Sequence, residues 1–207
     1  MKRILCFGDS NTYGYIPSGN GRYNEDIRWT GLLQKKLISK AVIVEEGLCG
    51  RTTVFQDQLR AGRRGIETLP ILLESHFPLD LVIVMLGTND CKTVYGASAE
   101  VIGKGAEQII RQIRLSSPQT QILLISPIWL GEDVWKPEYD PEFSPESIQV
   151  SKRLKEVYQK IAEKYECLFL AASDVAGASD TDQEHLDEKG HEELANAIYE
   201  TIRYIEQ

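Results

Sequence analysis

The amino-acid sequence predicts an α/β fold, in which a parallel sheet is covered by helices on both faces. Five short runs are rich in Val, Ile and Leu and mostly lack polar alternation, as strands buried on both faces do. They alternate with longer segments in which apolar residues recur every three or four positions, as in amphipathic helices. Alternating strands and helices are joined by right-handed crossovers. We therefore expect a three-layer α/β/α sandwich around a five-stranded parallel sheet.

The five predicted strands are separated by segments long enough to hold a helix. The strands cover residues 3–7, 41–46, 80–86, 121–126 and 166–171. The second and fifth have the weakest apolar pattern.

Five amphipathic helices are predicted between and after these strands. Ser144 and Pro145 mark the start of the fourth helix, because serine is a preferred cap and proline fits the first helical position. The apolar faces of the five helices are marked by Trp29, Leu32, Leu33 and Leu37; by Ile66, Leu69 and Leu73; by Val101, Ile102, Ala106, Ile109, Ile110 and Ile113; by Leu154, Val157, Tyr158, Ile161 and Tyr165; and by Leu194, Ile198, Ile202 and Ile205.

Length and composition narrow the classes of protein to consider. The 207 residues can bury one large core, and no linker divides them, so we expect a single domain over residues 1–207. The net charge of −8 argues against nucleic acid as a partner, because a binder needs a basic stripe to neutralise phosphates. No run of eighteen apolar residues occurs, so no membrane partner is expected.

The cysteines and the first residues bear on location. No secretory apolar run follows the first residues. The scattered cysteines are typical of free thiols in a reducing cytoplasm, and the absence of a C-x-x-C motif gives no support for a zinc or redox site. We expect a cytoplasmic protein with no metal and no cofactor. The four cysteines are Cys6, Cys49, Cys91 and Cys167.

Candidate functional residues follow the first three strands. Ser10, Gly50 and Asn89 lie three or four residues beyond the respective strand ends. In open parallel sheets, ligands bind beyond the carboxyl ends of the strands. If the three strands are neighbours, these loops form one crevice.

Ser10 is the candidate nucleophile. Gly8 allows a tight turn out of the first strand, and a helix that starts nearby would present the serine hydroxyl and its N–H. The same residues could form a plain strand-to-helix connection, because Asp, Ser and Asn are common in turns and caps. A phosphate-binding loop is a further alternative, but the required glycines and lysine are missing.

His185 is the candidate general base, and Asp182 the acid that orients it. Spacing of three residues lets one loop supply both groups, with the carboxylate on one ring nitrogen and the serine on the other. An exposed histidine in an acidic loop is the alternative interpretation. Asp180 and Glu184 are other possible orienting acids, although Glu184, being adjacent to His185, is expected to point elsewhere. His76 and His191 are assigned structural, packing or solvated roles.

The backbone N–H groups of Ser10 and Gly50 and the side-chain amide of Asn89 are candidate oxyanion donors. Gly50 and Asn89 could equally be turn residues. We expect Asp9 and Asp90 to hold their loops by accepting backbone hydrogen bonds.

Several residues are candidates for the pocket wall, and others are interpreted as surface. The cluster of Arg60, Arg63 and Arg64 is interpreted as a solvated helix start, and the segment 128–142 as a pocket rim or subunit contact. The pocket candidates are Asn11, Tyr13, Tyr15, Trp129 and Trp135.

These motifs together resemble the SGNH hydrolases, also called the GDSL esterase/lipase family. Gly8-Asp9-Ser10 resembles the first sequence block of that family, Gly50 its second-block glycine, Gly87-Thr88-Asn89-Asp90 its third block and Asp182-x-x-His185 its fifth. Longer stretches are similar to the arylesterase and acyltransferase branch. The resemblance implies the SGNH hydrolase fold, which is flavodoxin-like, and a serine esterase that acts on short-chain or aryl esters of small molecules. It also implies a homo-oligomer.

Two positions depart from the family pattern. Asn11 replaces the leucine of the GDSL motif, and Gln183-Glu184 replaces the small or apolar residues usual between the acid and the histidine. The additional carboxylate of Glu184 should raise the pKa of His185 and shift activity to higher pH. Two alternative functions stay open at this point: acyl transfer to an alcohol or sugar, and a non-catalytic flavodoxin-like domain that binds a phosphate or carbohydrate.

Overall fold

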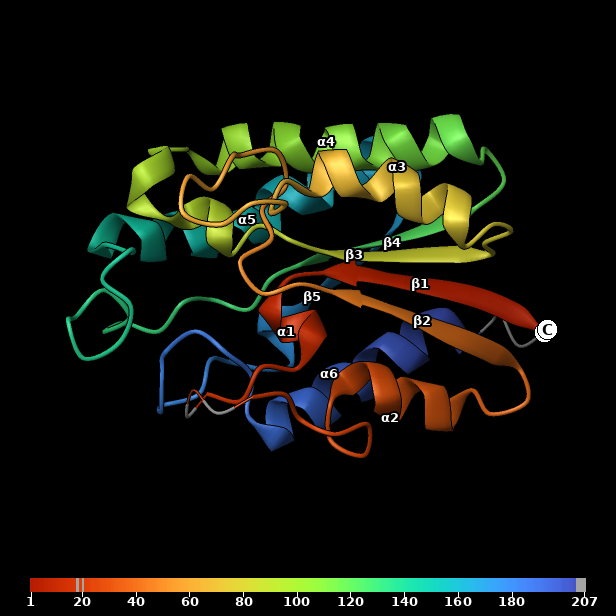
Figure 1. Ribbon diagram of the computed structural model, residues 1–207, viewed down its shortest axis with the longest axis horizontal. Helices are drawn as coiled ribbons and strands as arrows, with labels where there is room; N and C mark the ends of the chain where they lie inside the picture. The colour runs from red at the N-terminus through yellow and green to blue at the C-terminus, as the bar shows by residue number, and fades with distance from the viewer. Residues whose placement is uncertain (18, 20, 204–207) are drawn as a thin grey trace.

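The five strands form one parallel sheet, as the sequence predicted. The computed structural model describes residues 1–17, 19 and 21–203 (Figure 1). The strand order is β2-β1-β3-β4-β5, with every neighbouring pair parallel. This is the flavodoxin-like order, with β1 at the point where the connections change direction. The strands are β1 (Lys2–Gly8), β2 (Ala41–Gly47), β3 (Leu81–Met85), β4 (Gln121–Ser126) and β5 (Leu168–Ala171).

Helices cover both faces of the sheet, which confirms the three-layer prediction. In Figure 1, α3 and α4 lie above the sheet, and α2 and α6 lie below it. The apolar residues of α5 pack in the same core cluster as those of α3 and α4. The helices are α1 (Ser10–Tyr13), α2 (Trp29–Lys36), α3 (Gly65–Ser75), α4 (Ala99–Ser116), α5 (Pro145–Lys164) and α6 (Glu188–Ile202), with short 3₁₀ turns η1 (Asn89–Cys91), η2 (Thr93–Tyr95) and η3 (Ala172–Asp174).

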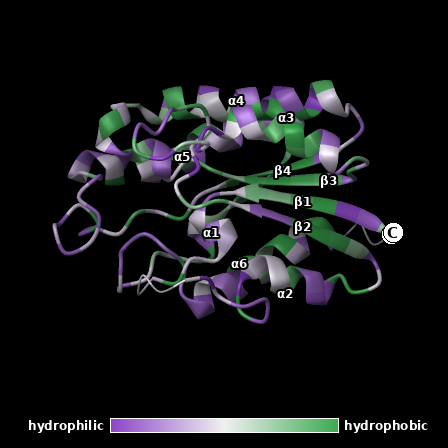
Figure 2. Ribbon diagram, in the orientation of Figure 1, coloured by the Kyte–Doolittle hydropathy of each residue, from purple (hydrophilic) through white to green (hydrophobic). Residues whose placement is uncertain are grey.

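Two apolar cores result from the alternation of side chains along each strand. Leu5 and Phe7 of β1 pack with the helices α3, α4 and α5, whereas Ile4 and Cys6 pack with α2 and α6. Successive side chains of a strand point to opposite faces. Figure 2 shows the consequence, since the strands are mainly hydrophobic and the helices carry hydrophilic outer faces.

Most predicted boundaries agree with the structure to within two residues. Helix α5 begins at Pro145, with Ser144 as its cap, as predicted. Strand β5 begins at Leu168 and not at residue 166, because Glu166 has a left-handed backbone (φ 51°) that turns the chain out of α5. The predicted helical residue Ile205 lies outside the described residues.

The sheet order brings three candidate loops together. Strand β1 lies between β2 and β3, and Gly8 at its carboxyl end is paired with Gly47 of β2 and Met85 of β3. The loops that follow these strands carry Ser10, Gly50 and Asn89, and they leave the same edge of the sheet. No helix in the described ranges is long and apolar enough to cross a membrane.

Candidate active site

Ser10 is the first residue of a four-residue helix directly after β1. A Cβ atom on Gly8 would lie 2.0 Å from the Oγ1 of Thr12, so the sharp turn out of the strand requires glycine. The Asp9 carboxylate caps the helix by accepting the N–H of Asn11 at 3.0 Å. Gly14, in the left-handed region (φ 83°), ends the helix. This short helix fixes the direction of the Ser10 side chain.

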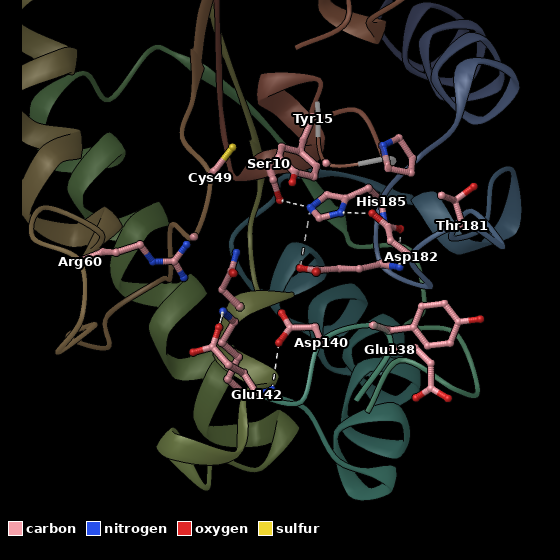
Figure 3. Close-up of a pocket in the computed structure, with 17 residues that line it drawn as sticks. Ser10, Tyr15, Cys49, Arg60, Glu138, Asp140, Glu142, Thr181, Asp182 and His185 are labelled. Carbon is pink, nitrogen blue, oxygen red and sulfur yellow. Dashed lines mark hydrogen bonds and ion pairs between the residues drawn. The ribbon is translucent and has the colours of Figure 1, made fainter. Parts of the chain in front are cut away.

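The Ser10 hydroxyl lies within hydrogen-bond distance of His185, although 174 residues separate them along the chain. The Ser10 Oγ is 2.8 Å from Nε2 of His185, and Nδ1 of the same ring is 2.7 Å from Oδ2 of Asp182 (Figure 3). Serine, imidazole and carboxylate therefore form one continuous hydrogen-bonded chain. A nucleophile, a base and the group that orients the base have this arrangement in serine hydrolases.

The loop that carries His185 is held from within by Asp182. Its second oxygen, Oδ1, accepts the backbone N–H groups of His185 (2.9 Å) and Glu184 (3.1 Å). Gln183 takes a left-handed conformation (φ 64°), which reverses the chain so that both N–H groups can reach the same oxygen. One carboxylate thus fixes both the backbone and the ring of His185.

Asn11 joins the Ser10 helix to this loop. Its Oδ1 accepts the N–H of Leu186 at 2.8 Å, and its Nδ2 donates to the carbonyl of Glu184 at 3.4 Å. A leucine could make neither bond. The residue that departs from the GDSL motif therefore helps to fix the distance between Ser10 and His185.

The two other candidate oxyanion donors, Gly50 and Asn89, border the same cavity as Ser10. Gly50 has a left-handed backbone (φ 79°), and a Cβ there would lie 2.9 Å from Cζ of Arg60. The Asn89 amide donates one hydrogen bond to the Arg51 carbonyl at 3.1 Å, which orients it. Its other N–H hydrogen is left for a group in the cavity.

Buried charges hold these loops in place. Both carboxylate oxygens of Asp90 accept the N–H of Thr53, at 2.9 and 3.1 Å, and Asp9 caps the Ser10 helix. These contacts confirm the loop-holding roles predicted for the two acids. Burial raises the pKa of Asp9 to about 7 and that of Asp90 to about 6. The Arg51 guanidinium donates to the carbonyls of Gly8 and Glu46, at the ends of β1 and β2.

A cavity of about 500 Å³ opens above the Ser10 hydroxyl. Its lining is mainly polar and comes from five separate parts of the chain (Figure 3). The lining residues are Ser10, Tyr15, Pro17, Gly19, Cys49, Gly50, Arg60, Asn89, Lys92, Glu138, Tyr139, Asp140, Glu142, Thr181, Asp182, Glu184 and His185.

Comparison with known proteins decides the family. Residues 6–193 match the model of the GDSL-like lipase/acylhydrolase family. The chain belongs to this family. It is an ester-hydrolysing enzyme with the SGNH hydrolase fold. No curated protein matches the sequence.

Solved structures of related esterases superpose over almost the whole chain. The native M. smegmatis aryl esterase is 33% identical, with a TM-score of 0.90 over 99% of this chain and 100% of that one. Est24, a carbohydrate acetylesterase from Sinorhizobium meliloti, is 33% identical, with a TM-score of 0.91 over the same shares. A carbohydrate acetylesterase family member, also from Sinorhizobium meliloti, is 32% identical, with a TM-score of 0.90 over 99% of both chains.

In this GDSL-like hydrolase the imidazole of His185 is buried among acidic groups. Burial by itself lowers the pKa of His185, but the negative charges of Glu184, Asp182 and Asp9 outweigh it and raise the pKa above 6.5. Burial opposes ionisation of Asp182, yet its hydrogen bonds from His185 bring its pKa below the usual value. Tyr15 covers the ring of His185, with ring centroids 4.6 Å apart.

Of the five predicted pocket residues, only Tyr15 lines the described part of the cavity. Asn11 is buried beneath it, and Tyr13 lies under the guanidinium of Arg22. Trp129 and Trp135 are 41% and 38% exposed and lie outside the lining. The aromatic pattern identified the correct loops but not which side of each loop faces the cavity.

The wall of the cavity contains residues that sequence reasoning did not place there. Arg60, interpreted as part of a solvated helix start, pairs with Asp57 at 2.9 Å and lies against the cavity. Lys92 is buried and pairs with Glu142. The segment 128–142 contributes a rim, in agreement with one of the two roles considered for it; its lining residues are Glu138, Tyr139, Asp140 and Glu142.

The two other histidines have structural contacts. His76 binds Glu46 at 2.9 Å, and His191 accepts the N–H of Trp29 at 3.3 Å. Burial lowers the pKa of His191 to about 4. All four cysteines are free thiols. In residues 1–17, 19 and 21–203, no group of three or more His, Cys, Asp or Glu side chains is arranged to hold a metal ion.

Proposed function

We propose that this enzyme is a serine esterase that hydrolyses short-chain acyl or aryl esters of small molecules through an acyl-enzyme at Ser10. The observation that carries the proposal is the hydrogen-bonded chain from Asp182 through His185 to Ser10, with distances of 2.7 and 2.8 Å. Both distances allow proton transfer without rearrangement.

Acylation begins when His185 removes the proton of Ser10 as the Ser10 oxygen attacks the ester carbonyl. The negative charge that develops on the carbonyl oxygen is stabilised by the N–H groups of Ser10 and Gly50 and by the Asn89 amide. His185, now protonated and stabilised by Asp182, gives its proton to the leaving alcohol. An acyl group remains on Ser10.

The cavity supports a small and polar substrate. About 500 Å³ accommodates a short acyl group together with an aryl or sugar-sized alcohol, and the lining offers many hydrogen-bonding groups. Structural neighbours include an aryl esterase and a carbohydrate acetylesterase. We therefore place acetyl esters of aryl alcohols and of sugars first among the candidate substrates.

Covalent labelling provides the direct test of this function. A fluorophosphonate should add one adduct per chain, and digestion followed by mass spectrometry should locate it on Ser10. The same enzyme should release acid from aryl and sugar acetates, with rates that fall as the acyl chain lengthens. Ester hydrolysis without any adduct on Ser10 would contradict the proposal, because the nucleophile would then be another group.

Removing the side-chain oxyanion donor should slow the chemical step. We expect Asn89→Ala to lower kcat by about 10²- to 10³-fold, with a small change in KM, because the amide acts on charge that develops in the transition state. Steady-state kinetics on an aryl acetate would measure this effect. A loss confined to KM would assign Asn89 to substrate binding in the ground state.

The acidic limb of the activity profile should report the pKa of His185. The imidazole must be neutral to accept the Ser10 proton, and its pKa lies above the ordinary value. As the pH is lowered, kcat/KM should therefore decrease with a midpoint above about 6.5. Replacing Glu184 by Gln removes a negative charge that favours the imidazolium and should move this limb to lower pH. A wild-type limb below about 6 would contradict the prediction.

Three other predictions from the sequence stay predictions. They are the cytoplasmic location, the homo-oligomeric state and the single domain over residues 1–207. Size-exclusion chromatography with light scattering would test the oligomeric state directly.

A further inference from the structure

Glu184 occupies a place in the cavity that the acylation step does not use. It is 8% exposed, it lines the cavity, and its Oε1 lies 3.9 Å from Nε2 of His185. This is the ring nitrogen that contacts the Ser10 hydroxyl, whereas Asp182 binds the opposite nitrogen. The sequence predicted that Glu184 would point away from His185. Instead, a second carboxylate flanks the point at which protons are exchanged.

The backbone of Glu184 is fixed, but its carboxylate has no firm donor. The N–H donates to Asp182 at 3.1 Å, and the carbonyl accepts from Asn11 at 3.4 Å. No group in residues 1–17, 19 and 21–203 donates a hydrogen bond to the carboxylate, and Nε2 of the imidazole, at 3.9 Å, is too far away for a direct hydrogen bond. The ammonium group of Lys92, in the same cavity wall, is bound to Glu142. A buried carboxylate without a donor is costly, so this site favours a small donor molecule in the cavity.

We propose that Glu184 positions the water that hydrolyses the acyl-enzyme and thereby favours hydrolysis over acyl transfer. This inference rests on the function proposed above. A water oxygen about 2.8 Å from each acceptor spans Nε2 of His185 and Oε1 of Glu184, which are 3.9 Å apart. Water can donate one hydrogen to each of them. An alcohol has one hydroxyl hydrogen, and its carbon atom would face the carboxylate.

The hydrolytic step balances with Glu184 as a pure acceptor. The water oxygen bonds to the acyl carbon while one of its protons moves to Nε2 of His185, and its other hydrogen stays bonded to Glu184. Collapse of the intermediate then breaks the bond from the acyl carbon to the Ser10 oxygen, which takes the proton back from His185. The carboxylic acid leaves, and Glu184 neither gains nor loses a proton.

Partitioning of the acyl-enzyme isolates this role from other effects. Water and an added alcohol compete for the same acyl-Ser10 and use the same base, so the product ratio does not depend on the acylation rate or on the fraction of active enzyme. A change in the pKa of His185 affects both routes together. The ratio of the transfer product to the hydrolysis product therefore reports how well the alcohol and the water are each positioned to attack the acyl group.

The experiment uses p-nitrophenyl acetate with a fixed concentration of 1-propanol, and measures propyl acetate against acetate by gas chromatography. Glu184→Leu should raise the ratio of transfer to hydrolysis by about tenfold, as expected for the loss of a hydrogen bond to a charged group. Glu184→Gln keeps an oxygen acceptor and should lie closer to the wild type. Glu188→Leu makes the same substitution at an exposed position outside the cavity and should leave the ratio unchanged.

Each outcome decides the inference. A ratio in Glu184→Leu equal to that of the wild type, with a normal burst of p-nitrophenol, would overturn it. Equal ratios in the Gln and Leu variants would also contradict an acceptor role for the side-chain oxygen. Absence of acyl-Ser10 in the wild type would instead overturn the proposed function, and the inference with it.

Discussion

Replacing Ser10 by alanine should lower kcat for an aryl acetate by about 10⁵- to 10⁶-fold. This is the loss expected when the nucleophile of a hydrogen-bonded Ser-His-Asp arrangement is removed. The variant retains His185 and the oxyanion donors, but it has no oxygen that can carry the acyl group. Its residual rate should show no burst of p-nitrophenol and no fluorophosphonate adduct. Steady-state and burst kinetics on purified protein would measure the loss.

The fold should survive this substitution. The Ser10 hydroxyl contacts His185, while the contacts that hold the helix are made by its backbone and by Asp9. Ser126→Ala is a matched control, because Ser126 is a buried serine at the end of β4 whose hydroxyl has no hydrogen-bond partner in the described chain. It should keep wild-type activity. Appreciable esterase activity in Ser10→Ala would reject Ser10 as the nucleophile.

Replacing Asp182 by asparagine should lower kcat by about 10³- to 10⁴-fold. The carboxylate binds Nδ1 of His185 at 2.7 Å and stabilises the imidazolium that forms during acylation. An amide provides no negative charge, and an N–H directed at Nδ1 would leave the proton on Nε2, where the ring cannot accept the Ser10 proton. Kinetics between pH 6 and pH 10 would show whether the loss persists when the imidazole is fully neutral.

A nearby aspartate gives the control for this effect. Asp180 was one of the two alternative orienting acids, but it is exposed and lies outside the described lining of the cavity. Asp180→Asn should therefore retain activity within about twofold, since exposed substitutions away from such contacts have small effects. A larger loss in Asp180→Asn than in Asp182→Asn would reverse the assignment of the orienting group.

The architecture could be predicted because the spacing of apolar residues along the chain indicates which segments are strands and which are helices. Continuous apolar runs such as 121–126 are typical of strands with two buried faces, and the structure has a strand over the same residues. Strand β5 was predicted two residues too long, because the left-handed turn at Glu166 depends on how α5 ends and not on apolar pattern. Sheet topology then explains why Ser10, Gly50 and Asn89 leave one edge.

The candidate site was predictable only in part. Residue chemistry and spacing indicated Ser10, Asp182 and His185, and the fold places their side chains in one hydrogen-bonded chain. The pocket wall was less accessible to prediction. Trp129 and Arg60 both lie on irregular loops, where side-chain direction has no fixed period, and only the second reaches the cavity.

By itself, the sequence determined the order in which strands and helices follow one another along the chain. It also determined the chemical groups that follow each strand, because both depend on residues close together in the sequence. Tertiary structure alone decided that Glu184 lies 3.9 Å from Nε2 of His185 and not away from it. That placement results from the left-handed turn at Gln183 and from the bonds that Asn11 and Asp182 make to the loop. The turn and the Asp182 bond are local, but the two Asn11 bonds join residues more than 170 positions apart, and no local sequence pattern predicts them.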